Sequence, residues 1–130
     1  MVVGQAAPSP PRERAAAHGA AAFRRGLAAL YSLSFAAMVV LFWRGATFYA
    51  TPLGERARHA GYWEWKAGGS IGLRLGMLGA AMMVLLLLYS VRKRVKALRR
   101  AGPIGRWLDI HIYLGVVGPL LIVLHTAFKV

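Results

Sequence analysis

The sequence contains no cysteine and few acidic residues, and both shortages restrict what the protein can be. Without cysteine there is no disulfide bridge, no iron–sulfur cluster held by thiolates, and no covalent haem attachment through a C-x-x-C-H motif. Any haem must therefore be bound noncovalently, through histidine. We also find no carboxylate pair, no nucleophile–base pair and no Gly-rich dinucleotide motif, so the sequence does not predict an enzyme that acts alone.

What the sequence has instead is apolar surface, since 58% of its residues are hydrophobic and the mean hydropathy is +0.49. These residues gather in three stretches, each close to the roughly 20 residues that a membrane-spanning helix needs. We expect transmembrane helices at about 27–49, 71–90 and 107–129. The predicted fold class is an all-α integral membrane protein with three transmembrane helices.

The segments between these stretches are predicted to lie outside the bilayer. Residues 1–25 are rich in Ala, Pro and Arg, have little to bury, and are expected to form a disordered, mobile tail. Residues 26–130 then form a single membrane domain, with an outer loop at 50–70 and a basic segment at 91–106.

The basic segment 91–106 is expected to continue the second helix as a basic helical extension. Val91, Val95 and Leu98 fall on one face at helical spacing, with basic residues around them. That face can lie on the bilayer while the charges meet anionic lipid headgroups.

The formal net charge of +13, from 17 Lys+Arg against 4 Asp+Glu, is explained by orientation in the membrane. Residues 91–106 contain seven Lys or Arg and no acidic residue. The positive-inside rule places this segment and the N-terminus in the cytoplasm, and the 50–70 loop and the C-terminus outside. Nucleic-acid binding is not expected, because topology accounts for the charge. The high Ala, Arg and Gly content is typical of a GC-rich bacterial genome, so we expect a bacterial inner membrane.

Two histidines on the last apolar stretch form the candidate site. His111 and His125 are fourteen residues apart, which places them about 21 Å apart along a helix and within roughly 40° of each other around its axis. Each then lies near one edge of a hydrocarbon core about 30 Å thick. Histidine is rare in membrane helices, and Gly115 and Gly118 on the same side give a flat macrocycle room to approach. The pattern favours one metal cofactor at each histidine; the alternative is hydrogen bonding to neighbouring helices, with the glycines serving close packing.

Three further points concern the identity of the metal, the role of Arg74 and a stripe of small residues. The metal can be the iron of haem or, as a minor alternative, the magnesium of a chlorophyll-type pigment. Arg74 either extends to the lipid headgroups or pairs with a haem propionate. Gly68, Gly72, Gly76 and Ala80 form a stripe of small residues, for which close helix packing is the expected role.

The stretch His111-Ile-Tyr-Leu-Gly115 through Leu124-His125-Thr126 resembles the third helix of the ferric-reductase-like transmembrane domain. This family includes ferric reductases and NADPH oxidases, and the likeness covers residues 107–128. The resemblance implies two b-type haems stacked across the membrane, with His111 as an axial ligand of the cytoplasmic-side haem and His125 of the outer-side haem. Family members take the opposing ligands from a second histidine-bearing helix and carry soluble flavin and nicotinamide domains, which this sequence does not include.

Three sources of the opposing ligands stay open: the rest of a longer protein, another membrane subunit, or a second copy that pairs each histidine with its equivalent. The leading prediction is a membrane b-type cytochrome subunit, the electron-transfer part of an oxidoreductase. Histidines on both sides of the iron leave no open coordination position, which favours electron transfer over oxygen chemistry. The alternative is a cofactor-free accessory subunit that stabilises a larger membrane complex. A transporter is a weaker option, because the charges within the spans lie near their ends.

The predicted orientation can be tested with reporter fusions. A fluorescent protein fused after Arg100 should fold and fluoresce, because the basic segment is retained in the cytoplasm. The same reporter fused after Gly54, in the 50–70 loop, should be exported and dark. The opposite pattern would reverse the assignment of sides.

Overall fold

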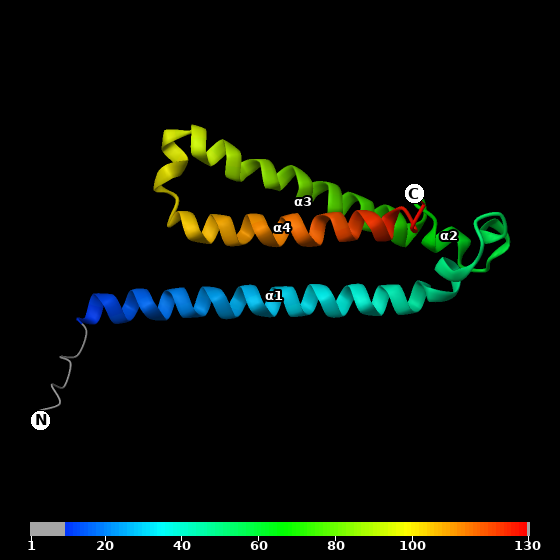
Figure 1. Ribbon diagram of the computed structural model, residues 1–130, viewed down its shortest axis with the longest axis horizontal. Coiled ribbons are helices and arrows are strands. Elements are labelled where there is room, and N and C mark those ends of the chain that lie inside the picture. Colours follow the sequence, from blue (N-terminus) through cyan, green and yellow to red (C-terminus); the bar gives the residue numbers. More distant parts are fainter. Residues whose placement is uncertain (1–9, 130) are drawn as a thin grey trace, which may run out of the picture. The chain divides into compact units, whose positions relative to one another are not determined.

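The computed structural model describes residues 10–129, and every regular element in that range is a helix (Figure 1). In chain order these are α1 (Pro11–Ala50), the 3-10 helix η1 (Arg56–Arg58), α2 (Tyr62–Trp65), α3 (Ser70–Arg94), the 3-10 helix η2 (Lys96–Arg100) and α4 (Ile104–His125). The chain divides into two compact units, residues 1–35 and 36–130, and each is described by itself.

Three helical segments in the described part of the chain are long and apolar enough to cross a membrane: Pro11–Ala50, Tyr62–Arg94 and Ile104–His125. Many of their large apolar side chains are exposed, and Trp43 is 79% exposed. A soluble protein rarely leaves so much apolar surface in water, whereas a lipid bilayer solvates it. The prediction of an all-helical chain with three apolar helices is confirmed, and the architecture is consistent with an integral membrane protein.

The first helix is longer than the sequence analysis predicted. α1 begins at Pro11, so residues 11–25, expected to be disordered, are helical. The reason is local: proline suits the first helical position, Glu13 faces the positive end of the helix dipole, and alanine has the highest helix propensity. The remainder of the predicted mobile tail, residues 1–9, lies outside the described residues.

The basic segment does not continue α3 to residue 100, so the predicted helical extension is wrong. α3 ends at Arg94, and the backbone of Val95 is extended, with φ −93° and ψ 112°. The short η2 follows at Lys96–Arg100. Val91, Val95 and Leu98 therefore do not share one face of a continuous helix.

The helix ends here because Arg92 draws the following chain back onto α3. The side chain of Arg92 is only 3% exposed. Its guanidinium donates hydrogen bonds to the carbonyl oxygens of Leu98, at 3.1 Å, and Gly102, at 2.6 Å, and its Cζ lies 4.9 Å from the ring centroid of Trp107. A continuous helix would carry those carbonyls away from Arg92. The turn lets α4 begin at Ile104, three residues earlier than predicted.

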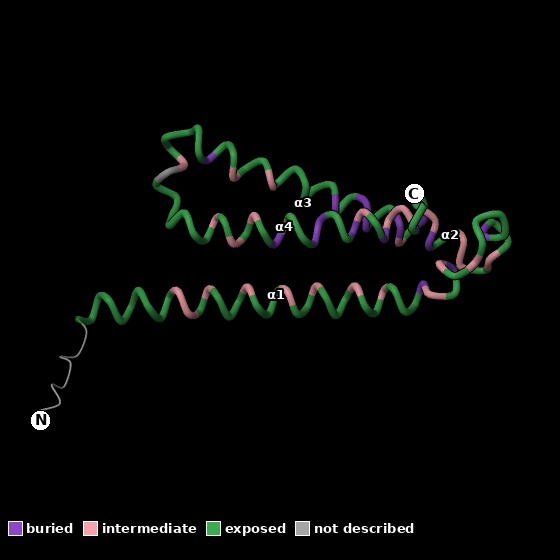
Figure 2. Tube along the Cα trace, in the orientation of Figure 1, coloured by how far each residue is buried: buried purple, intermediate pink, exposed green. Residues whose placement is uncertain are grey.

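α3 and α4 lie side by side as an antiparallel pair (Figure 1). Buried positions gather where the two helices face each other (Figure 2). On α3 these positions include Gly72, Gly76 and Gly79. Of the predicted stripe of small residues, Gly76 packs against α4 as expected, whereas the Cβ position of Gly72 faces the backbone of Lys66. Gly79 takes the place of the exposed Ala80, and Gly68 precedes the helix.

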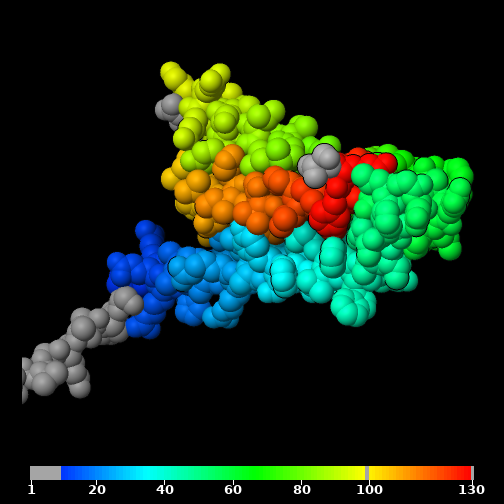
Figure 3. Space-filling model, turned by 45° about the vertical axis from the view of Figure 1, so that its right-hand side comes forward, coloured from blue at the N-terminus to red at the C-terminus, as the bar shows by residue number. Residues whose placement is uncertain are grey.

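At the opposite end of the α3–α4 pair, Arg56 joins the last residues of α1 to the chain that follows α4. Its guanidinium donates hydrogen bonds to the carbonyl oxygens of Tyr49, Thr51 and Ala127, each at 2.8 Å. Its Cζ lies 5.4 Å from the ring centroid of Phe48. In Figure 3 the red end of the chain meets the green segment that contains Arg56. A cation is stabilising here, because the C-terminal ends of both helices carry negative partial charge.

Replacing Arg56 with Lys should lower the free energy of unfolding by about 2 kcal/mol. One ammonium group cannot serve three carbonyls with the geometry of a guanidinium, and each buried carbonyl without a donor costs roughly 1–3 kcal/mol. The matched control is Arg58→Lys, because Arg58 is exposed and should tolerate the change within about 0.5 kcal/mol. Denaturation in detergent micelles measures both variants, and equal stabilities would contradict the role given to Arg56.

Candidate functional site

The predicted histidine face of α4 is the face that packs on α3. His111 meets Tyr89, Gly115 meets Leu86, Gly118 meets Met82, and His125 meets Gly76. This order is that of an antiparallel pair, in which the residues that face each other lie equally far from Arg100 along the chain to within one position. The two histidines therefore lie at opposite ends of one helix–helix interface, within the unit formed by residues 36–130.

His125 is held by the backbone of α3. Its Nδ1 lies 2.8 Å from the carbonyl oxygen of Gly72. A carbonyl oxygen only accepts hydrogen bonds, so Nδ1 must carry the proton, and the lone pair of the neutral ring lies on Nε2. Histidine ligands of metals commonly have this arrangement, with one nitrogen on the metal and the other donating to a carbonyl.

Gly76 provides the space that the ring of His125 occupies. A Cβ atom at Gly76 would lie 2.6 Å from His125 Nδ1 and 2.7 Å from its Cε1, closer than real Cβ contacts come. The absence of a side chain is therefore a requirement of this contact. Gly76 of α3 therefore leaves room for the imidazole ring of His125 at one end of the α3–α4 interface.

The environment of His111 is different. Its ring centroid lies 4.8 Å from that of Tyr89, with 33° between the ring planes. Its Nδ1 is buried and has no hydrogen-bond partner among the described residues. A buried polar atom left unpaired costs roughly 1–3 kcal/mol, so a group that bonded this ring would remove part of that cost.

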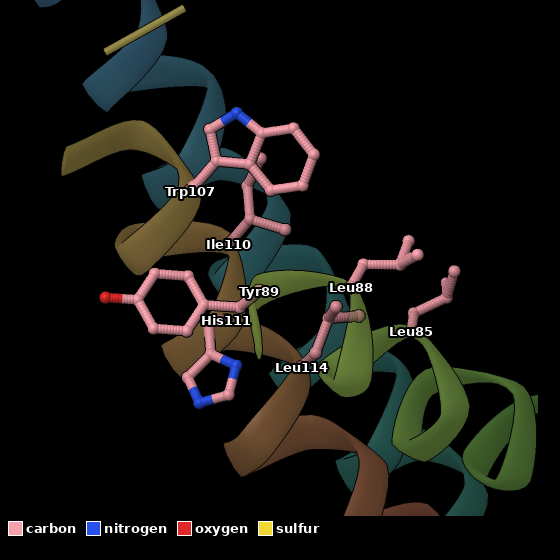
Figure 4. Close-up of a pocket in the computed structure, with 7 residues that line it drawn as sticks. All are labelled: Leu85, Leu88, Tyr89, Trp107, Ile110, His111 and Leu114. Atoms are coloured by element: carbon pink, nitrogen blue, oxygen red, sulfur yellow. The ribbon is translucent and has the colours of Figure 1, made fainter. Parts of the chain in front are cut away.

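His111 also lines an apolar cavity of about 290 Å³ between α3 and α4 (Figure 4). The other lining residues are Leu85, Leu88, Tyr89, Trp107, Ile110 and Leu114. Pockets that enclose a ligand usually measure about 300–1,000 Å³, so this one is at the lower limit. It can take part of a flat macrocycle or a small apolar group, and a larger cofactor would need further walls from outside the described residues.

The other predicted site residues have separate environments. Gly118 is buried, and a Cβ there would lie 3.4 Å from the Cβ of Met82, so this glycine serves helix packing. Gly115 is exposed, and the nearest atom to its Cβ position, on Leu86, is 3.7 Å away, so the surface beside it is low. Arg74 is exposed on α3, as an arginine that extends to headgroups would be.

The described residues do not form a complete metal site. Between residues 10 and 129 no group of three or more His, Cys, Asp or Glu side chains is placed to hold a metal ion. Each histidine can contribute one ligand, and an opposing ligand would come from outside this part of the chain. A symmetric pairing of two α4 helices through Gly118 would need the face that α3 covers.

Sequence reasoning missed Tyr89 and Trp107, which lie with His111 around the cavity. A signal was available. Tyr89 and His111 are each eleven residues from Arg100, so a tight helical hairpin centred there would bring them together. The prediction of a helical extension over the basic segment leaves no hairpin at Arg100, so it misses the pairing of Tyr89 with His111.

Comparison of the chain with protein-family models, with curated proteins and with solved structures found no match. The resemblance of residues 107–128 to the ferric-reductase-like domain stays a prediction, and so do the haems that it implies.

Glycine substitutions should separate packing positions from open ones. Gly118→Leu should destabilise the protein by about 1–3 kcal/mol, because the new side chain overlaps α3 at Met82. Gly115→Leu, one turn away on an exposed surface, should stay within about 1 kcal/mol of the parent. Detergent unfolding curves give both values, and a larger loss at Gly115 would contradict this assignment.

Proposed function

We propose that the protein is a membrane-embedded b-type cytochrome subunit that carries electrons across the bilayer, with His111 and His125 each holding one haem. The observation that carries the proposal is the hydrogen bond from His125 Nδ1 to the Gly72 carbonyl. It leaves Nε2 of a neutral ring with a free lone pair, the form in which histidine binds a metal. When bound, haem supplies a one-electron iron couple.

The surroundings of His111 support the same role at the other end of α4. The apolar cavity beside it would exclude water from one edge of a bound macrocycle, and the aromatic rings of Tyr89 and Trp107 form part of its wall. The buried Nδ1 of His111 has no hydrogen-bond partner among residues 10–129, which supports a partner for this ring from elsewhere. We propose that another subunit or a further part of a longer chain provides the opposing ligands, because α3 covers the α4 face through which two copies would pair.

The proposed location is a bacterial inner membrane with the N-terminus in the cytoplasm. Arg92 is buried in the turn and cannot reach lipid, but Lys93, Arg94, Lys96 and Arg100 are exposed. These exposed charges would contact anionic headgroups on the cytoplasmic side.

A cofactor-free accessory subunit is the second candidate, and one observation favours it. The same His125–Gly72 hydrogen bond joins α3 to α4, which is a structural role that needs no metal. Under this alternative the histidines stabilise the helix pair, and the exposed apolar surface of the chain docks into a larger complex.

The first measurement is a reduced-minus-oxidised visible spectrum of the purified protein, with and without the partners that copurify with it. We expect the sharp bands of bis-histidine b-type haem in at least the partner-bound sample, because the proposal takes the second ligand of each haem from a partner or from a further part of a longer chain. The double variant His111→Ala/His125→Ala should insert normally and lose these bands. A full haem complement in the double variant would contradict the ligand assignment.

His125→Asn separates the two candidates. The amide nitrogen of Asn lies at the same covalent distance from Cβ as Nδ1, so it can still donate to the Gly72 carbonyl but cannot replace Nε2 as a ligand. A cytochrome should lose one haem component while the helix pair keeps its stability. His125→Ala is the matched control and should lose about 1 kcal/mol of stability as well. If Asn preserves the haem spectrum of the parent protein, His125 is not a ligand.

A further inference from the structure

We infer that Gly72 and Gly76 are positioning residues that make the two histidines inequivalent: the Gly72 carbonyl fixes His125 as the Nδ1–H tautomer, whereas no residue in the described part of the chain provides such a partner for His111. The effect of this inequivalence on the midpoint potential of a bound haem rests on the proposed function. The tautomer of His125 does not rest on the proposed function, because it follows from contacts between residues of this chain.

The acceptor is fixed because Gly72 cannot move freely. It lies in the first turn of α3, and a Cβ at this position would overlap the carbonyl oxygen of Lys66 in the preceding turn. The amide of Leu73 donates to the Gly69 carbonyl at 2.8 Å, which holds the start of the helix. The Gly72 carbonyl has two lone pairs, so it can accept from the helix backbone and from His125 together.

The ring of His125 is equally constrained. Gly76, one helical turn after Gly72, leaves the ring only the space of the missing side chain. Rotation of the imidazole would require the two helices to separate. The carbonyl and the glycine surface therefore select both the tautomer and the orientation of His125 before any metal binds.

His111 has no equivalent support. The residue that faces it on α3 is Tyr89, whose ring lies beside the imidazole, and its Nδ1 has no partner among the described residues. Hydrogen bonding from Nδ1–H to a carbonyl makes an imidazole a stronger electron donor to a bound metal. A stronger donor favours ferric over ferrous iron, so the haem that depends on His125 should have the lower midpoint potential.

The tautomers can be measured without haem. In the full-length protein with ¹⁵N-labelled histidine, long-range ¹⁵N–¹H correlation spectra distinguish Nδ1–H from Nε2–H rings. We expect His125 as a single Nδ1–H tautomer. His59 provides an internal reference for the opposite form, because its Nδ1 accepts a hydrogen bond from the Gly61 amide at 3.0 Å. An Nε2–H signal from His125 in the parent protein would overturn the inference, whether or not haem is present.

Gly76→Ala tests the positioning directly. The added methyl group should displace the ring, so the His125 signal should shift towards a mixture of tautomers while that of His111 stays unchanged. The matched control is Gly79→Ala, whose Cβ would lie 2.9 Å from Ile122 Cδ1 and 3.1 Å from the Gly118 carbonyl oxygen, so it presses on α4 to a similar degree but away from both histidines. If both variants change the His125 signal equally, or neither does, the role given to Gly76 is wrong.

A redox titration then tests the electronic consequence. The component lost in His125→Ala should titrate at the lower midpoint potential, and Gly76→Ala should raise that potential more than Gly79→Ala does. If the component lost in His125→Ala had the higher midpoint potential, the proposed difference between the two histidines would be wrong. Parent protein without haem would refute the proposed function and leave the tautomer result standing, so the two failures are distinguishable.

Discussion

The close approach of α3 and α4 is the constraint on which the rest of the described structure depends. In lipid, helices gain little from burying apolar side chains, so association relies on packing and on interhelical hydrogen bonds. Here Gly76 and Gly79 leave a shallow surface on α3, which α4 fills with His125 and Ile122, and the Gly72 carbonyl accepts a hydrogen bond from His125. The same contact gives His125 its hydrogen bond, so the geometry of the candidate site and the stability of the helix pair have one origin.

Two buried arginines terminate this interface, one at each end. Arg56 gathers carbonyls at the ends of α1 and α4, and Arg92 gathers those of the turn between α3 and α4. Both occupy positions where the backbone leaves a helix and its carbonyls lose their helical partners. Arg92 belongs to the basic segment from which the membrane orientation is predicted, but the side chains of both arginines bind backbone carbonyls. The other basic residues of the 91–106 segment still predict the same orientation by the positive-inside rule.

The structural role of His125 is compatible with its proposed role as a ligand, because its two ring nitrogens can serve different purposes. Nδ1 donates to α3, while Nε2 keeps a lone pair. His111 shares the helix face but not this support, and it lies beside an apolar cavity and the ring of Tyr89. A site built from two histidines on one helix therefore need not be symmetric, since the opposite helix presents glycine to one and tyrosine to the other.

The sequence by itself determined the three apolar helices and the alignment of His111 with His125, because both follow from composition and from the 3.6-residue period of one helix. It failed at helix ends: Pro11 and the alanines extend α1, and Arg92 stops α3 through contacts with residues six and ten positions later. Only the tertiary structure decided which helix covers the histidine face, which arginines are buried and which nitrogen of His125 carries its proton. Those properties depend on pairs such as Gly72 with His125 and Arg56 with Ala127, separated by 53 and 71 residues, and no local pattern specifies such pairs.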